Sequence, residues 1–330
     1  MKSSLKIILI LLVISAPLFG QQVTKKLFVA SWNVENLFDT FDDKDKRDDE
    51  FLPEGRKEWT EKRLETKYKN LAKVIRFMND GNGPDILGVQ EVEHKALLKK
   101  LFKKHISEKN YKIAYAESPD KRGIDNALIY DADLFSFIAQ KELEVVLPDK
   151  YPTRLILWVK LKYEDEILNV FVNHWPSRRG GEEKSEPNRI AAAKTLKKAV
   201  EMIKKDSPEE NIIIMGDFND EPENNSIYKV LGADNSDYLV NLSFSAYKNG
   251  LGTYRYRGDW NMLDQIIINK LLLEGNFRTT QASFNVLKPD FTVQKEGRYK
   301  GTSFPTYGGR KYLGGYSDHY PVGIVLTYTK

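Results

Sequence analysis

Short apolar segments that end in polar residues recur along this chain. The clearest covers residues 212–215, four bulky apolar side chains, and runs directly into the polar segment 216–220. An unbroken apolar run of this length is typical of a strand buried on both faces. Such a strand would deliver a carboxylate and an amide to the edge of a sheet, where loops on a rigid scaffold carry function. On its own the pattern fits equally well a strand that ends in an Asx-type turn.

Helical and strand-like patterns alternate along the rest of the chain. Apolar residues spaced three and four apart predict helices at residues 59–79, 96–106 and 186–205. Short apolar segments predict strands at residues 26–32, 86–89, 126–130, 153–161, 167–172, 212–215, 263–268 and 322–328. Because no break in composition separates the halves, we expect one α/β domain with layered sheets.

The N-terminus has the pattern of a secretory signal peptide. Lys2 and Lys6 accompany an apolar run over residues 7–19, which is shorter than the roughly 20 residues that a membrane-spanning helix needs. We therefore predict that residues 1–20 are a signal peptide and that residues 21–330 form a single domain with no membrane span. The protein would then be exported, either to the periplasm or to the medium. The alternative is a retained N-terminal anchor.

The amino-acid composition excludes disulfide bonds but does not indicate a binding partner. The 330 residues contain no Cys, which excludes a disulfide framework. The predicted signal peptide holds two lysines and no acidic residue, so its removal lowers the formal net charge from +4 to +2. A net charge this small does not indicate a polyanionic partner.

Two segments have an unusual local composition. Residues 39–54 are rich in aspartate and predict a solvated loop, since the glycine and final glutamate of a calcium-binding loop are missing. Residues 291–315 contain one acidic residue, Glu296, against five lysines and arginines, with tyrosine and phenylalanine interleaved. This second segment fits either a site for a phosphate-rich ligand with flat bases or an ordinary solvated loop.

Six strand ends or adjacent turns carry polar residues. In chain order they are Trp32-Asn33-Val34-Glu35-Asn36, Gln90-Glu91, Asn173-His174, Asp217-Phe218-Asn219, Asp264-Gln265 and Ser317-Asp318-His319. A carboxylate inside an apolar strand, such as Asp264, needs a cationic or hydrogen-bonding partner. We predict His319 as that partner, because a carboxylate behind an imidazole fixes its tautomer and raises its basicity.

These residue types favour metal-assisted hydrolysis of a phosphate ester. Carboxylate and amide oxygens without Cys suit a hard cation such as Mg²⁺, and a His–carboxylate pair can deprotonate water near neutral pH. Zinc is disfavoured because no His-x-x-x-His spacing is present, and Gly-x-Ser-x-Gly, P-loop and dinucleotide motifs are absent. The remaining histidines, His94 and His105, are predicted to lie on the surface.

In this order the six motifs resemble those of the endonuclease/exonuclease/phosphatase superfamily, which includes DNase I, abasic-site endonucleases, neutral sphingomyelinases and inositol polyphosphate 5-phosphatases. The resemblance covers residues 27–328 and implies a four-layer α/β sandwich, two mixed β-sheets packed face to face with helices outside. The long segment after the first motif, residues 39–63, is more similar to exported bacterial nucleases of this superfamily than to abasic-site repair enzymes.

The resemblance implies a metal site and a general base. Glu91 would be the principal Mg²⁺ ligand, aided by Asn33 and Asp318, with Mn²⁺ or Ca²⁺ as other suitable ions. His319, oriented by Asp264, would be the general base for the attacking water.

The resemblance also implies contacts to the substrate. Asp217 would position the nucleophile or protonate the leaving oxygen, and Asn219 would hold a phosphate oxygen. His174 would contact the scissile phosphate and act as an acid.

Three arginines follow the His174 motif. Arg178 and Arg179 are predicted to clamp a phosphate, with a basic turn before the helix as the alternative. For Arg189, in the predicted helix, orientation toward the site and toward solvent remain equally open.

The combined pattern predicts an exported Mg²⁺-dependent phosphodiesterase, an endonuclease with DNA or RNA as substrate. We expect a monomer without a stable protein partner. The alternative within the superfamily is a phosphatase or a phospholipase C-like hydrolase acting on an inositol phosphate, a sphingolipid or a sugar phosphate. No long apolar hairpin for membrane insertion is visible. A non-catalytic binding protein on the same fold is disfavoured, because every motif residue is present.

Overall fold

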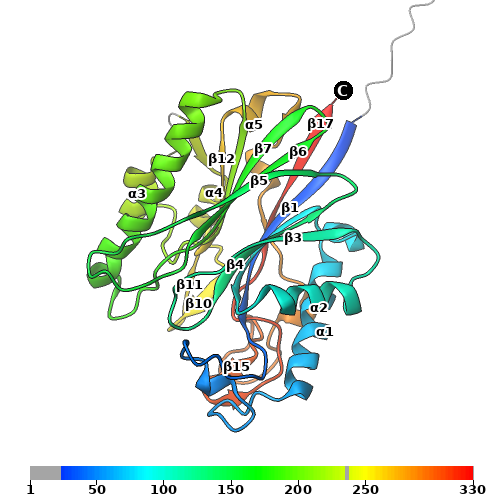
Figure 1. Ribbon diagram of the computed structural model, residues 1–330, viewed down its shortest axis with the longest axis vertical. Coiled ribbons are helices and arrows are strands. Elements are labelled where there is room, and N and C mark those ends of the chain that lie inside the picture. Colours follow the sequence, from blue (N-terminus) through cyan, green and yellow to red (C-terminus); the bar gives the residue numbers. More distant parts are fainter. Residues whose placement is uncertain (1–23, 235–237, 330) are drawn as a thin grey trace, which may run out of the picture.

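Two mixed β-sheets lie face to face at the centre of the computed structural model, which describes residues 24–234 and 238–329 (Figure 1). In the first sheet the strands are ordered β13 (Phe277–Arg278), β17 (Val322–Thr329), β1 (Thr24–Leu37), β2 (Ile86–Val92), β4 (Asp125–Asp131) and β3 (Tyr111–Ala116), and β14 (Asn285–Val286) also pairs with β17. In the second sheet the order is β5 (Ser136–Leu143), β6 (Ile156–Tyr163), β7 (Glu166–His174), β8 (Asn211–Asp217), β12 (Asp264–Asn269) and β9 (Leu239–Asn241).

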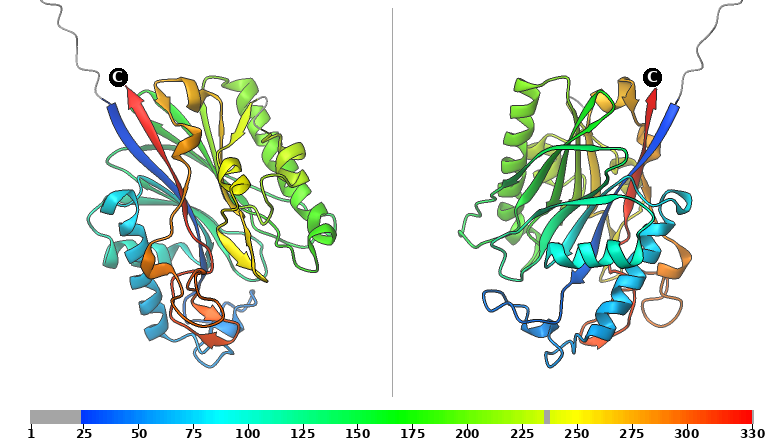
Figure 2. Two further views of the ribbon diagram at one scale, coloured as in Figure 1. Left: turned by 180° about the vertical axis from the view of Figure 1, so that it is seen from behind. Right: turned by 45° about the vertical axis from the view of Figure 1, so that its right-hand side comes forward.

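Helices cover the outer faces of both sheets. Helices α1 (Glu61–Phe77) and α2 (Lys95–His105) lie on the first sheet, and α3 (Glu182–Asp206) lies on the second (Figure 2). The short helices α4 (Phe244–Lys248) and α5 (Leu271–Glu274) flank β12 in the sequence. This arrangement confirms the four-layer α/β sandwich that the motif resemblance implied.

Three apolar clusters fill the spaces between the four layers. The central cluster joins inward-facing residues of both sheets, such as Val29, Val170 and Ile324, all of which are fully buried. A second cluster lies under α1 and α2, and a third lies under α3. Helix α1 contributes buried residues at helical spacing, and its first turn is capped by the Thr60 side chain, which accepts a hydrogen bond from the Arg63 backbone N–H.

The predicted helices and strands are all present, with ends shifted by a few residues. The sequence pattern did not predict β3 and β5, which form one edge of each sheet, or shorter strands such as β9, β13 and β14. Most of β5 is exposed, so it lacks the unbroken apolar run by which the other strands were recognised. The aspartate-rich loop is largely exposed as predicted, but Asp48 and Phe51 within it are buried, and the Phe51 ring stacks on Phe38 at 4.3 Å.

Strand direction brings the polar strand ends together. Strands β1 and β2 run parallel, as do β7 and β8, so each pair ends at one edge of its sheet. Strands β12 and β17 begin at those edges, since Asp264 pairs with Asp217 at the end of β8 and β17 follows directly after the His319 motif. The Asn33 side chain donates a hydrogen bond to Asp217, which joins the two sheet edges.

The predicted signal peptide, residues 1–20, lies outside the described residues. Among the described residues, no helix has both the length and the apolar character needed to cross a membrane.

Short additional elements surround this edge of the sandwich. Two small hairpins are formed by β10 (Tyr254–Tyr256) with β11 (Asp259–Asn261) and by β15 (Tyr307–Gly308) with β16 (Lys311–Tyr312). Figure 1 shows β15 at the lower end of the molecule, with β10 and β11 above it. A π-helical turn at Ser226–Leu231 follows the Asp217 loop and packs beside α3.

Candidate active site

His319 and Asp264 form a hydrogen-bonded pair at the centre of the gathered motifs. His319 Nδ1 lies 2.7 Å from Asp264 Oδ2, and both residues are buried. The Tyr254 ring stacks on the imidazole with ring centroids 4.7 Å apart. Because Asp264 holds Nδ1, the other ring nitrogen, Nε2, is left to face Asp217 at 3.9 Å. The predicted pairing of His319 with Asp264 is therefore present.

Negative charge dominates the surroundings of His319. Burial would lower the pKa of the imidazole, but the charges of Asp264, Asp318 and Asp217 outweigh it and raise the pKa well above its ordinary value. A cation bound nearby would offset these charges and lower the pKa toward the range that suits a general base.

Asp217 lies between the two histidines of the motifs. Its Oδ2 atom is 3.9 Å from His319 Nε2 and 3.7 Å from His174 Nε2, and it accepts a hydrogen bond from the Asn33 side chain at 3.0 Å. Burial, opposed by His319 and reinforced by the negative charge of Asp264, raises the pKa of Asp217 to about 6. A carboxyl group in this range can hold or release a proton near neutral pH.

The glycine before Asp217 permits a close approach of two strands. Gly216 adopts φ 138°, and a Cβ atom there would lie 2.0 Å from the Asn173 carbonyl oxygen. Only glycine avoids both the strain and this clash. The Gly-Asp sequence thus allows β8 to end flush against β7, with Asp217 opposite His174.

Glu91 and Asp318 supply a second group of carboxylates. Glu91 Oε2 accepts the Asn36 backbone N–H at 3.0 Å, and Oε1 lies 3.9 Å from His174 Nε2. Burial, opposed by His319 and reinforced by the negative charge of Glu91, raises the pKa of Asp318. Carboxylates held near each other at a partly exposed edge are a suitable donor set for a hard cation. Asp217, Asp264 and His319 also bring ligand atoms within 4.8 Å of one another.

Asn33 supports Asp217 more directly than it offers a free ligand. Its side-chain nitrogen donates to Asp217, and its Oδ1 atom accepts the Glu35 backbone N–H at 3.0 Å. The Oδ1 atom keeps a second lone pair, so the predicted role of Asn33 as a metal ligand stays a prediction.

His174 is fully surrounded by protein. Burial, together with the positive charges of Arg154 and Arg122, lowers its pKa well below the ordinary value. The neutral imidazole that results can still donate a hydrogen bond to a phosphate oxygen. Its predicted role as an acid stays a prediction, since the anionic phosphate that it would contact favours the protonated form.

Asn219 has most of its polar atoms engaged within the protein. Its backbone N–H donates to Asp217 Oδ1 at 2.9 Å, and its side-chain nitrogen donates to the Trp175 carbonyl oxygen at 3.0 Å. These hydrogen bonds leave one side-chain N–H of Asn219 unused. That N–H could make the predicted contact to a phosphate oxygen.

The left-handed backbone conformation recurs at this edge. Glu35, Asn36, Glu91 and Asn219 all have φ between 50° and 65°. This region is sparsely populated by residues other than glycine, and each such residue costs of order 1–3 kcal/mol. The concentration of strained backbone at the gathered motifs is typical of a functional site.

Arg178, which was predicted together with Arg179 to clamp a phosphate, is engaged by protein acceptors, and the phosphate role of the two stays a prediction. Its Nε donates to the Asn219 carbonyl oxygen at 2.9 Å, and its other nitrogens bind Asn261 and Asn224 side chains at 3.2 and 2.9 Å. The guanidinium therefore donates to acceptors within the protein, and it holds the loop that carries Asn219. Arg179 is exposed.

Arg189 faces neither the site nor solvent. It is fully buried, and its Nε lies 2.6 Å from Asp220 Oδ1. Asp220 follows the Asp217 motif directly, so this ion pair fixes the far side of the same loop.

Arg122 is a further cation at this edge, beside Glu91. Its side chain is half exposed, Nη1 lies 3.6 Å from Glu91 Oε1, and Nη2 donates to the Asn36 side chain at 2.6 Å. It is the residue whose exposed guanidinium, beside Glu91, best fits a substrate phosphate. No motif marks it in the sequence, because it lies in the turn between β3 and β4 and does not directly follow an apolar run.

A buried ion pair ties the site to the segment before the His319 motif. The Glu35 carboxylate accepts the backbone N–H groups of Thr306 and Tyr307 at 2.6 and 3.2 Å. Lys67 Nζ donates to Thr306 Oγ1 and the Tyr316 carbonyl oxygen at 2.6 and 2.8 Å and lies 4.0 Å from Glu35. Burial and the charge of Asp318 raise the pKa of Glu35 to about 7. Glu35 and Lys67 together hold the segment that precedes Asp318 in place.

The two remaining histidines lie outside this centre. His94, together with Asp39 and Glu93, places ligand atoms within 4.8 Å of one another. His105 is not on the surface as predicted, since only 12% of its side chain is exposed and its ring packs 6.0 Å from that of Tyr68.

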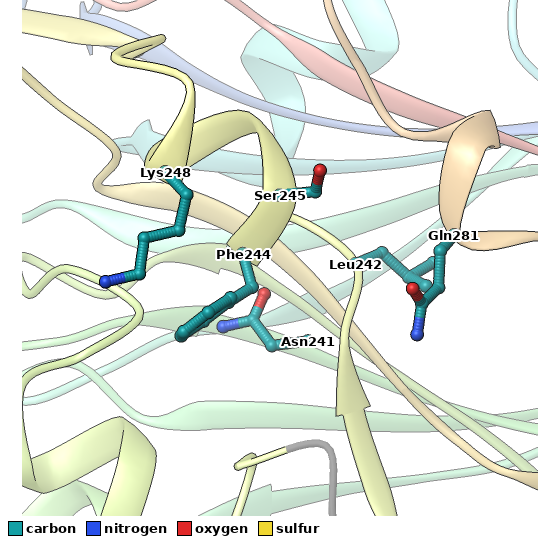
Figure 3. Close-up of a pocket in the computed structure, with 6 residues that line it drawn as sticks. All are labelled: Asn241, Leu242, Phe244, Ser245, Lys248 and Gln281. Atoms are coloured by element: carbon teal, nitrogen blue, oxygen red, sulfur yellow. The ribbon is translucent and has the colours of Figure 1, made fainter.

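One hollow opens near the motifs, and another lies away from them. The larger, of about 850 Å³, has Tyr254 and Asp318 in its lining and so opens at the centre just described. The smaller, of about 280 Å³, is lined by residues of β9 and α4 and by Gln281 (Figure 3). No motif residue lines the smaller one.

Comparison with known proteins gives a family and a fold. The model of a family described as the Endonuclease/Exonuclease/phosphatase family matches residues 28–328. No curated protein sequence matches the chain. A total of 197 chains in solved structures are similar to this one.

Three of these solved structures illustrate the range. Truncated TDP2 from Caenorhabditis elegans is 17% identical with a TM-score of 0.59, over 91% of this chain and 97% of that one. A mannosyl-6-phosphatase from Bacteroides thetaiotaomicron is 16% identical with a TM-score of 0.57, over 91% and 99%. The human Nocturnin catalytic domain is 17% identical with a TM-score of 0.54, over 94% and 98%. At such identities the likeness shows the fold and leaves the substrate to be argued from the site.

Proposed function

The chain belongs to the endonuclease/exonuclease/phosphatase family of hydrolases, and we propose that it is a metal-dependent phosphodiesterase whose substrate is nucleic acid. The observation that carries the proposal is the juxtaposition of the His319–Asp264 pair with Asp217, whose Oδ2 atom lies 3.9 Å from His319 Nε2. A base and a carboxyl of raised pKa are thereby aimed at the same small volume.

Glu91 and Asp318 would hold the divalent cation. Their carboxylate oxygens are the donors that Mg²⁺ prefers, and the negative charge that raises the pKa values of Asp318 and His319 supports the fit. When bound, such a cation would neutralise charge on the phosphate and on the transition state. Mn²⁺ and Ca²⁺ use similar donors and remain candidates.

The proton transfers are assigned to His319 and Asp217. His319 Nε2 would take a proton from water as the water oxygen bonds to phosphorus, while Asp264 holds the imidazole and stabilises its charged form. The phosphorus–oxygen bond to the leaving group would break, and Asp217 would give its proton to the departing oxygen. Asn33 would keep Asp217 in place, and His174 would donate a hydrogen bond to a phosphate oxygen.

A long substrate is favoured over a small phosphomonoester. The hollow that opens at Asp318 has a volume of about 850 Å³ and carries arginine and tyrosine side chains. A phosphomonoester such as a sugar phosphate would fill only the catalytic end of it. The mannosyl-6-phosphatase of the same fold keeps the phosphatase alternative in the test below.

A substrate panel tests the proposal. Purified protein would be given plasmid DNA, single-stranded DNA and RNA beside sphingomyelin, inositol phosphates and mannose 6-phosphate, each with Mg²⁺, Mn²⁺ or Ca²⁺. We expect cleavage of a nucleic acid that EDTA abolishes. Intact nucleic acids together with rapid release of phosphate from a monoester would replace the nuclease with a phosphatase.

Export and a monomeric state are parts of the same proposal. They rest on the basic and apolar pattern of residues 1–20 and on the absence of any partner requirement in the motifs. Intact-mass measurement of protein secreted by a bacterial host should show cleavage near Gly20, and light scattering should give the mass of one chain.

A further inference from the structure

A groove continues from the catalytic centre along two segments that the proposed mechanism does not use. It has a volume of about 850 Å³ and is lined by the β10–β11 hairpin, by the segment 294–313 and, at one end, by Asp318. Its volume falls within the roughly 300–1,000 Å³ of typical ligand sites. Tyr254 of the hairpin stacks on His319 and forms a β-bridge with it, so the groove and the centre share a wall.

Each of the two segments contributes an exposed tyrosine. Tyr256 in the hairpin is 53% exposed and Tyr299 in the segment 294–313 is 58% exposed. Large aromatic side chains are normally buried, and their exposure in a groove beside a reaction centre indicates contact with a ligand. A phenol ring offers a flat face on which any nucleobase can stack.

An arginine accompanies each tyrosine. The Arg257 guanidinium lies 5.2 Å from the Tyr256 ring centroid, and that of Arg298 lies 5.7 Å from the Tyr299 ring centroid. Within residues 24–234 and 238–329, neither arginine forms an ion pair with a carboxylate. The lining therefore combines unneutralised positive charge with aromatic faces.

We propose that this groove binds an unpaired nucleic-acid strand next to the scissile phosphate. Bases of the strand stack on Tyr256 and Tyr299, and Arg257 and Arg298 bind its phosphates. The bases of a duplex are already stacked and paired, so only a single strand can present free faces to both rings. The inference rests on the proposed function and deepens it, because it names single-stranded nucleic acid as the substrate class.

Binding of short oligomers tests the tyrosines. The probes are fluorescently labelled oligothymidylate and an abasic oligomer of the same length and charge, titrated in EDTA so that no hydrolysis occurs. Changing Tyr256→Ala and Tyr299→Ala should each weaken oligothymidylate binding about 5–150-fold. Binding of the abasic oligomer should stay within about twofold of wild type. The changes Tyr256→Phe and Tyr299→Phe should retain the affinity for both probes.

The arginines are tested by the salt dependence of the same binding. Arg257→Ala and Arg298→Ala should weaken both oligomers alike, and each should reduce the slope of log affinity against log salt by about 0.7. Phe137→Ala and Arg278→Ala are matched controls, since both residues are exposed and lie on strands at the opposite end of the sandwich. These two controls should bind like wild type.

Failure of the groove proposal can be distinguished from failure of the proposed nuclease function. Hydrolysis of bis(p-nitrophenyl) phosphate should be unchanged in the control variants Phe137→Ala and Arg278→Ala, and wild-type thermal unfolding of the tyrosine variants shows that their fold is intact. Tyrosine variants that bind oligothymidylate as tightly as wild type, or that lose the same factor on the abasic oligomer, overturn the inference. Tyrosine-dependent binding in a protein that cleaves no nucleic acid would uphold the groove and overturn the nuclease.

Discussion

Asp264 lies in one β-sheet and His319 lies just before a strand of the other, so the 2.7 Å hydrogen bond between them joins the two sheets. Asp264 opens β12 in the second sheet, whereas His319 precedes β17 in the first. The pair therefore exists only when the two sheets are packed together. If the two sheets separate, the pair is broken and catalysis by it should be lost.

Removing either member of the pair should reduce turnover and spare the fold. We expect His319→Ala to lower kcat about 10²–10⁴-fold, the usual cost of losing a general base, and Asp264→Asn to lower it because the imidazole loses its orienting carboxylate. Steady-state hydrolysis of bis(p-nitrophenyl) phosphate measures both. Asp290→Asn removes an exposed carboxylate elsewhere and should leave kcat unchanged. Full activity in His319→Ala would refute the assignment of the base.

Glu91→Gln should weaken metal binding. The substitution keeps the size of the side chain but removes a charged ligand, so the loss should be at least the roughly 10–100-fold that removal of an outer-shell partner costs. Isothermal titration with Mn²⁺ measures the affinity without any need for turnover. Glu108→Gln, at an exposed ion pair with Arg76, is the control. An unchanged affinity in Glu91→Gln would place the cation elsewhere.

Arg178 and Arg179 should behave differently although they are neighbours. Arg178→Ala removes the donor that holds the Asn219 carbonyl oxygen, and a displacement of about 1 Å in a catalytic loop can cost about 10²-fold in rate. Arg179→Ala, at an exposed position, should change kcat less than about twofold. Equal losses in both variants would support the phosphate clamp that the sequence pattern suggested.

Arg122→Ala should raise KM more than it lowers kcat. Its half-exposed guanidinium beside Glu91 is expected to bind a substrate phosphate, and a hydrogen bond to a charged group contributes about 1.5–3 kcal/mol, or roughly 10–150-fold in affinity. Lys121→Ala changes the adjacent exposed cation and should have little effect on either constant. A selective fall in kcat for Arg122→Ala would instead indicate a role in the transition state.

The buried Lys67 should contribute strongly to stability. Lys67→Met leaves Glu35 without its cation, and loss of one member of a buried pair costs about 3–5 kcal/mol. Lys69→Met, an exposed position on the same helix, should cost less than about 0.5 kcal/mol. Urea denaturation compares the two free energies of unfolding. Equal midpoints for the two variants would show that the pair does not stabilise the native state.

Much of the site could be predicted because its residues lie at strand ends. Asp217 and Glu91 follow apolar runs that are readable from the sequence, and parallel pairing brings such ends to one edge. The partnership of His319 with Asp264 followed from the cost of an unpaired carboxylate in an apolar strand. These inferences depend on local patterns and on general rules of sheet geometry.

The remaining features depend on contacts between distant segments. Arg178 looked like a phosphate ligand because its acceptors, Asn219, Asn224 and Asn261, lie 41, 46 and 83 residues away. The partnership of Lys67 with Thr306 spans 239 residues and leaves no periodic signal in either segment. Local sequence patterns indicate which residues are buried, but they carry no information on the partners of Arg178 and Lys67.

The pairing of β1 with β17 constrains how the protein can be made. Strand β1 lies between β2 and β17, with partners from Thr24↔Thr329 to Ser31↔Val322. During synthesis β1 emerges early, and one of its edges stays unpaired until almost the entire remaining chain has been translated. An unpaired apolar edge invites association with other chains, and contacts of such sequence separation form slowly. A nascent chain would therefore have to remain unfolded, or be held by a chaperone, until β17 is available.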